Sequence, residues 1–196
     1  MVAFEPLSEK YFYKDTLALA RSLLGRILVH CSPEGITSGI IVETEAYLSK
    51  GDPACHAARG KTKRNAAMFG PPGRAYIYFI YGMHYCFNVV SNAVGIGEAV
   101  LIRALEPVGG LSLMEKRRKK NRPLFNLTNG PGKLCAAMGI DRRLNGLPLF
   151  LSPLYLTEGI AVDVNLIKSS GRIGINQAKD KPWRFFIEGN LFVSRR

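Results

Sequence analysis

Acidic and phenolic side chains alternate in the apolar stretch "IVETEAYL" at residues 41–48. In an extended strand, residues two apart share a face, so Ile41, Glu43, Glu45 and Tyr47 should point the same way, with neighbours about 7 Å apart. The other four residues of the stretch are expected to face the core. A carboxylate beside an aromatic ring in a partly dry cleft can act as a general base. An exposed polar face with solvated glutamates is the competing interpretation.

A second group of reactive side chains follows in a long loop expected over residues 50–74, which is polar, basic and interrupted by "GPPG". His56 comes soon enough after Tyr47 to fold back over that ring. A packed or solvated histidine and a solvated charge run are the alternatives. The loop also carries four cations that predict a grip on phosphate groups, namely Arg59, Lys61, Lys63 and Arg64.

Tyrosines crowd the stretch "YIYFIYGMHYCFN" at residues 76–88. Two apolar-aromatic runs flank Tyr81 and Gly82, which predicts a tight hairpin turn with Tyr81 at its tip. A bulky ring that projects from a stiff turn can act as a wedge in a base stack. The neighbouring tyrosines offer surfaces on which bases could stack, although some could be core residues.

The net charge of the chain indicates what kind of partner it binds. The chain has 196 residues, with 27 Lys and Arg against 15 Asp and Glu, a net charge of +12. Such an excess is typical of proteins that bind polyanions, because each neutralised phosphate releases counterions. A basic protein without such a partner is the alternative. No apolar segment approaches the roughly 20 residues that span a bilayer, and no leader pattern is seen, so we expect an intracellular protein without a membrane partner.

The four cysteines suggest no metal chemistry. They form no C-x-x-C pair and no zinc-like spacing with the three histidines. We expect reduced, packed thiols, no bound metal and no cofactor.

The elements that must position these side chains indicate an α+β protein. We find no repeat, low-complexity tract or linker, so residues 1–196 should form a single compact domain. We expect a largely antiparallel β-sheet with surrounding helices and a protruding β-hairpin.

Three helices are expected. Helical spacing of apolar residues predicts one over residues 15–28, with Asp15 or Thr16 as its cap. Ser112 and Glu115 could form a capping box for a basic helix that runs to about Asn121 and offers a second phosphate grip. The segment "NGPGKLCAAMGI" should be a glycine-rich turn that enters a further helix.

The remaining strands are expected in five places outside the tyrosine-rich stretch. Residues 39–48 should form a strand after a turn at "SPEG", and "EAVLIRALEP" should form another. Strand-like patterns return near the end of the sequence in "IAVDV", "GRIGI" and "WRFFIEG".

Several of these motifs together resemble the alkyladenine (3-methyladenine) DNA glycosylase family. They are "ETEAYL", His56, "RNAAMFGPPGRAYIYFIYGMHYCFN", "VLIRALEP" and "NGPGKLC", in the family's order and at compatible spacings. The resemblance implies a monofunctional enzyme that flips a damaged purine out of duplex DNA. Alkylated, deaminated and etheno bases are the implied substrates. An activated water would hydrolyse the N-glycosidic bond and leave an abasic site for base excision repair.

The resemblance also implies catalytic roles. Glu45 matches the general base that activates the water, whereas Glu43 is expected to have a supporting or surface role. Arg103 and the backbone carbonyl of Ile173 match groups that hold this water.

Base and DNA recognition are implied at other positions. Asn88 matches the residue that limits activity on guanine, and Tyr81 and Met83 match DNA-intercalating residues. The four loop cations would bind the DNA backbone. The walls of the base pocket are implied to be Tyr47, His56 and Tyr78.

The implied partner is double-stranded DNA that contains damaged purines, bound by a monomer. Two other interpretations use the same surface features. One is a noncatalytic nucleic-acid-binding domain that recognises distorted duplexes, which would not need Glu45 beside Tyr47. The other is an RNA-directed module, since the family's fold resembles the C-terminal domain of methionyl-tRNA formyltransferase.

Overall fold

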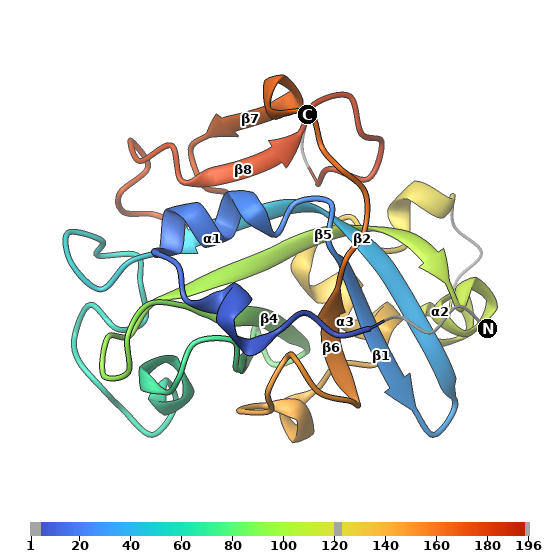
Figure 1. The fold of residues 1–196 in the computed structure, drawn as a ribbon, viewed down its shortest axis with the longest axis horizontal. Coiled ribbons are helices and arrows are strands. Elements are labelled where there is room, and N and C mark those ends of the chain that lie inside the picture. Colours follow the sequence, from blue (N-terminus) through green and yellow to red (C-terminus); the bar gives the residue numbers. More distant parts are fainter. Residues whose placement is uncertain (1–4, 120–122, 195–196) are drawn as a thin grey trace.

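One antiparallel sheet organises the molecule, and the computed structural model describes residues 5–119 and 123–194 (Figure 1). Its strands run in the order β3-β4-β5-β2-β1-β6, and β8 pairs with both β2 and β7. The predicted α+β class with a largely antiparallel sheet is confirmed. The strands are β1 (Ile27–Ser32), β2 (Gly35–Tyr47), β3 (Ala75–Ile80), β4 (His84–Val90), β5 (Ala99–Gly109), β6 (Leu154–Thr157), β7 (Ile167–Ser170) and β8 (Arg184–Ile187).

Three α-helices pack around this sheet: α1 (Thr16–Ser22), α2 (Leu111–Arg118) and α3 (Pro131–Met138). In Figure 1, α1 lies across β2 and β5, and the Thr44 hydroxyl of β2 donates to the carbonyl of Ala20 at 2.9 Å. Helix α3 packs on β4 and β5. None of the helices in the described part of the chain is long and apolar enough to cross a membrane.

Strand β2 is central and is buried on both faces from Thr37 to Ala46. Its first half pairs with β1, its second half pairs with β8, and β5 runs along its other edge. A bulge between Ile41 and Glu43 breaks the alternation. Ile41 and Val42 therefore both belong to the core, which corrects the prediction that Ile41 shares the polar face. The alternative of solvated glutamates is also wrong, because Glu43 and Glu45 are both 0% exposed.

Helix α1 is shorter than the predicted 15–28 segment. Its predicted cap is confirmed, because the Asp15 carboxylate accepts from the backbone N–H of Ala18 at 2.9 Å. The helix ends at Ser22, and Gly25 has a left-handed φ of 82°. Ile27 then starts β1 opposite Ile40, so sheet pairing overrides its helical spacing.

Helix α2 does not begin with the predicted capping box. Its N-cap is Gly110, at a left-handed φ of 73° and without a side-chain cap, so Ser112 and Glu115 lie inside the helix. A Cβ at Gly110 would meet the carbonyl oxygen of Ile36 at 2.3 Å, so close packing against the neighbouring strand fixes where the helix starts. The last helical residue is Arg118, and the predicted end near Asn121 lies outside the described residues.

The segments after α3 differ most from prediction. Neither "IAVDV" nor "GRIGI" is a strand, and only "WRFFIEG" contains one, β8. Strands β6 and β7 lie elsewhere. The irregular conformation of "GRIGI" matters below, because it brings Arg172 and Ile173 to the end of β2.

The long loop after β2 is ordered around a small apolar cluster of its own. Residues from the loop pack there with residues of β3, β4 and β5, and the loop contains one short 3-10 helix, Ala66–Phe69. The loop thereby holds a fixed position beside the sheet. The buried members are Cys55, Ala57, Met68, Tyr76, Val90 and Ala99.

Strands β3 and β4 pair antiparallel, with Ile80 opposite His84. The turn lies at the predicted place, since Tyr81 and Gly82 both have left-handed φ values of 53° and 64°. The N–H of Met83 donates to the carbonyl of Ile80 at 3.3 Å. Positive φ at both central residues matches the right-handed twist of paired strands, and it is uncommon for a tyrosine.

We predict that buried His30 makes the fold sensitive to acid. Its Nδ1–H donates to the Met138 carbonyl at 2.7 Å, and burial lowers its pKa. The unfolded chain, with a histidine pKa of about 6.5, therefore binds more protons below that pH. The free energy of unfolding should be unaffected above about pH 6.5 and should fall below it by up to about 1.4 kcal/mol per pH unit.

Urea unfolding at several pH values tests this, with His30→Gln beside the wild type. The variant should lose part of the acid-side slope, whereas His84→Gln, at an exposed position, should keep it. Equal slopes in wild type and His30→Gln would contradict the prediction.

Candidate active site

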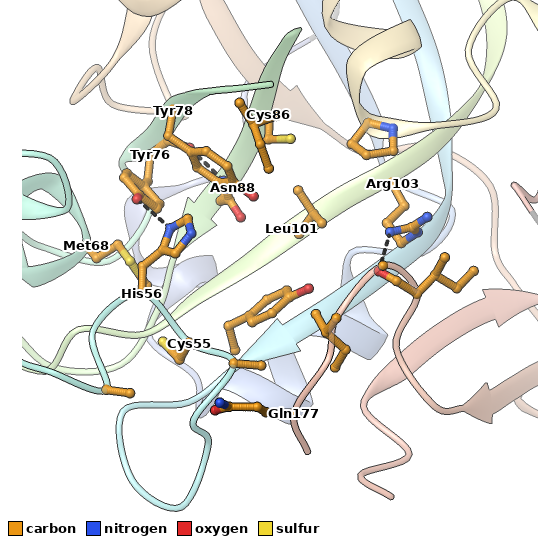
Figure 2. A pocket seen from close by; sticks show the side chains of 18 of the residues that line it. Cys55, His56, Met68, Tyr76, Tyr78, Cys86, Asn88, Leu101, Arg103 and Gln177 are labelled. Carbon is orange, nitrogen blue, oxygen red and sulfur yellow. Dashed lines mark hydrogen bonds between the residues drawn. The ribbon is translucent and has the colours of Figure 1, made fainter. Parts of the chain in front are cut away.

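A cavity of about 770 Å³ opens between β3, β4, the loop after β2 and the segment at residues 173–177. Figure 2 shows His56, Tyr76 and Tyr78 grouped at one side of it and Arg103 at the other, with Leu101 between them. Most of the predicted site residues lie together here. Those lining the cavity are Tyr47, His56, Arg59, Arg64, Tyr78, Tyr81, Asn88, Arg103 and Ile173.

Glu45 lies directly behind this lining. The Tyr47 hydroxyl donates to its Oε2 at 2.7 Å, and the backbone N–H of Ile173 donates to its Oε1 at 2.7 Å. Arg103 Nη1 lies 3.3 Å from the same Oε1. All three partners line the cavity, so the carboxylate is held just beneath its floor by hydrogen-bond donors from three segments of the chain.

A bulge in β5 aims Arg103 at the carboxylates. The register steps from Glu43 opposite Ala104 to Thr44 opposite Ile102, so Arg103 has no directly opposed residue. Bulges of this kind turn a side chain out of the regular alternation. Burial opposes the positive charge, but the neighbouring Glu45 and Glu43 carboxylates raise the pKa of Arg103.

The Ile173 backbone contacts both Glu45 and Arg103. Its N–H binds Glu45, and its carbonyl accepts from Arg103 Nη1 at 3.4 Å, the contact drawn in Figure 2. Both groups therefore position the catalytic candidates in the described structure.

Glu43 is buried, which excludes the surface role allowed for it. Its Oε1 accepts from Arg184 Nε at 2.6 Å and from Arg103 Nε at 3.2 Å. The Ser194 N–H donates to its Oε2 at 2.7 Å. Arg184 and Ser194 were missed by sequence reasoning, and no local pattern marks them.

The aromatic side chains hold one another in fixed orientations. His56 and Tyr78 meet edge to face with centroids 4.5 Å apart, and His56 Nδ1 lies 2.9 Å from the Tyr76 hydroxyl. Burial raises the pKa of Tyr76 to about 12 and also raises that of Tyr78 and Tyr47. Partial burial and nearby Arg64 lower the pKa of His56. All four rings are therefore neutral at physiological pH.

Asn88 contributes an amide of fixed orientation. Its Nδ2 donates to the backbone carbonyl of Tyr76 at 2.9 Å, and only 4% of the residue is exposed. Because the amide nitrogen is engaged, the rotation of this side chain is restricted where it lines the cavity.

A buried ion pair that sequence reasoning missed fastens the two segments beside Glu45. Arg172 donates to both carboxylate oxygens of Asp52 at 2.6 Å and to the Ala46 carbonyl at 3.0 Å. Its guanidinium stacks on the rings of Tyr47 and Trp183. The ion pair therefore fixes the position of the Tyr47 ring. It also fixes the segment that leads into Ile173.

The predicted DNA-contacting residues are exposed, and Tyr81, Arg59 and Arg64 among them also line the cavity. Tyr81 and Met83 at the β3–β4 turn are 78% and 68% exposed. Buried Asn65 holds the basic loop, because it donates to the carbonyls of His56 and Gly60. The four cations predicted to bind phosphate are all exposed: Arg59, Lys61, Lys63 and Arg64.

We predict that Asp52→Asn is strongly destabilising, because it leaves the Arg172 guanidinium buried without a counter-charge. Loss of one partner of a buried pair costs about 3–5 kcal/mol. Urea unfolding measures this. Lys168→Ala removes a half-exposed pair with Glu188 and should change the free energy of unfolding little. Similar losses in both variants would contradict a special role for the buried pair.

Comparison with known proteins identifies the family of the chain. The model of the family "Methylpurine-DNA glycosylase (MPG)" matches residues 10–191. Proteins from Carboxydothermus hydrogenoformans and Methanoculleus marisnigri are each 50% identical over 97% of this chain and 99% of their own. A protein from Prosthecochloris aestuarii is 48% identical over 94% of this chain and 89% of its own. All three carry the name "Putative 3-methyladenine DNA glycosylase". The chain belongs to the methylpurine-DNA glycosylase family.

Proposed function

We propose that this DNA glycosylase flips damaged purines out of duplex DNA and hydrolyses their N-glycosidic bonds with a water activated by Glu45. The observation that carries the proposal is the buried Glu45 carboxylate, held beneath an aromatic cavity by Tyr47, Arg103 and Ile173. A domain that only bound distorted DNA would have no need of it.

The contacts of the Glu45 carboxylate account for three of its lone-pair sites. A carboxylate offers about four lone-pair sites. Oε1 is engaged by Ile173 and Arg103, and Oε2 by Tyr47. The fourth lone-pair site is on Oε2, the oxygen that accepts from Tyr47, and Tyr47 lines the cavity. A water there would lose its proton to Glu45 as it attacks the sugar carbon.

Glu45 would also act through its charge. The N-glycosidic bond breaks through an oxocarbenium-like state, which a nearby carboxylate stabilises. Arg103 holds the Glu45 carboxylate in position through their 3.3 Å contact. The sugar needs no covalent bond to the enzyme, because the water takes the place of the departing purine on the sugar carbon.

The neutral rings of Tyr47, His56 and Tyr78 are suited to hold the flipped base. Extrusion of a base costs a few kcal/mol, and less when damage weakens its pairing. Stacking of the flipped base on an aromatic ring offsets roughly 1–3 kcal/mol of this cost. Alkylation makes a purine cationic, which favours contact with the faces of electron-rich rings.

Asn88 would limit attack on normal guanine. The Tyr76 carbonyl holds its side-chain amide in place, so the amide would clash with the exocyclic amino group of guanine. Adenine and hypoxanthine carry no amino group at that position of the ring.

The exposed turn and the basic loop would bind the duplex. Tyr81 and Met83 would enter the stack at the position vacated by the base. The loop cations Arg59, Lys61, Lys63 and Arg64 would neutralise phosphates on either side, which accords with the net charge of +12.

We predict that Glu45→Gln binds damaged DNA but does not release the base. The change keeps the size of the side chain and removes the proton acceptor, so the rate should fall by about 10²–10⁴-fold. Single-turnover cleavage of a duplex that contains hypoxanthine, followed by alkali, measures it. Glu188→Gln, at a largely exposed carboxylate, is the matched control and should act as wild type. Equal rates for Glu45→Gln and wild type would remove Glu45 from the mechanism.

Tyr81→Ala should weaken binding to damaged DNA by about 1–3 kcal/mol, because the vacated stack is no longer filled. Binding to undamaged duplex of the same sequence should change less. Fluorescence anisotropy measures both dissociation constants, with Tyr13→Ala as the control at another exposed tyrosine. If the two affinities fall by the same factor, Tyr81 does not act as a wedge.

A further inference from the structure

Ser194 enters the buried charge network beneath the candidate active site. Its backbone N–H donates to Glu43 Oε2 at 2.7 Å, and its hydroxyl donates to Glu43 Oε1 at 2.9 Å. The same hydroxyl oxygen accepts from Arg103 Nη2 at 3.3 Å. Ser194 lies beyond residues 10–191, which match the family model.

Arg103 is shared between two buried carboxylates. Its Nε lies 3.2 Å from Glu43 Oε1, and its Nη1 lies 3.3 Å from Glu45 Oε1. Because Arg103 has no directly opposed residue across the sheet, contacts of its side chain decide how the guanidinium is turned. Glu43 and Glu45 therefore compete for the same cation.

Ser194 settles this competition in favour of Glu45. Glu43 already accepts hydrogen bonds from Arg184 Nε at 2.6 Å and from both donors of Ser194. These contacts stabilise its charge, so it depends less on Arg103. The Ser194 hydroxyl also engages Nη2, while Nη1 lies 3.3 Å from Glu45 Oε1 and donates to the Ile173 carbonyl at 3.4 Å.

We propose that Ser194 is a positioning residue that holds the Arg103 guanidinium on Glu45 and thereby sets the rate of base release. The inference rests on the proposed function, since it concerns the same carboxylate. Without the hydroxyl, Nη2 loses its acceptor and Glu43 loses a donor. The guanidinium then turns toward Glu43 and leaves Glu45.

The test compares Ser194→Ala with Ser194→Thr, which restores a hydroxyl. Single-turnover release of hypoxanthine should fall about 10–100-fold in Ser194→Ala, as for partners that orient catalytic groups, and should recover in Ser194→Thr. The dissociation constant for a duplex with a hydrolysis-resistant 2′-fluorinated lesion should not change. A fall in rate matched by the same loss of affinity would overturn the proposal.

Ser170→Ala is the matched control. The Ser170 hydroxyl accepts from Arg184 Nη1 at 2.9 Å, and within the described residues it contacts neither Glu45 nor Arg103. This variant should keep the wild-type rate, and an equal fall in Ser170→Ala and Ser194→Ala would overturn the proposal. If Ser194→Ala does not fold, Ser194→Cys keeps the side-chain size with a weak hydrogen-bonding group and should lose rate in the same way.

A readout independent of catalysis separates this inference from the proposed function. The NMR resonance of the Arg103 Nε–H group, assigned with Arg103→Lys, should shift in Ser194→Ala and not in Ser170→Ala. An unshifted resonance would overturn the inference. A wild-type protein that releases no damaged purine would contradict the proposed function, and the resonance would still decide the role of Ser194.

Discussion

The fold is built around two carboxylates that cannot reach bulk water. Glu43 and Glu45 are both 0% exposed on the central strand β2. A buried charge costs several kcal/mol unless cations and hydrogen-bond donors surround it. The donors come from β5, β8 and the segments that hold Ile173 and Ser194. The elements that follow α3 in sequence therefore complete the interior of a sheet whose central strands come earlier.

Burial of the acids together with arginines also affects the charge of the surface. Three buried acids contact three buried arginines: Glu43, Glu45 and Asp52 with Arg103, Arg172 and Arg184. These six charges sum to zero, so the whole net charge of +12 lies on the rest of the chain. The interior holds a balanced network for chemistry, while the exterior keeps the positive field that favours association with a polyanion.

Part of the cavity wall belongs to loops, and each of these loops has its own means of support. The loop after β2 has a small apolar cluster, and Asn65 binds its backbone at two points. The Arg172–Asp52 pair ties its start to the segment that holds Ile173. Functional side chains are often carried on loops, provided that a rigid scaffold fixes them. Here the scaffold consists of local clusters as much as of the sheet.

Much of the candidate site could be predicted from sequence, because its parts follow local rules. Period-two alternation put Glu43 and Glu45 on one side, where both contact Arg103. Two residues with left-handed φ mark the turn at Tyr81, as the flanking aromatic runs predicted. The fold class, the family and most of the predicted residues that line the cavity thus follow from the sequence.

Only the folded structure shows that both glutamates are buried and that a bulge aims Arg103 at them. It also shows that Arg172, Arg184 and Ser194 complete the network. Ser194 is 151 residues from Glu43, and a contact across such a separation depends on how the whole chain folds in space. A contact of this kind leaves no periodic mark in either segment.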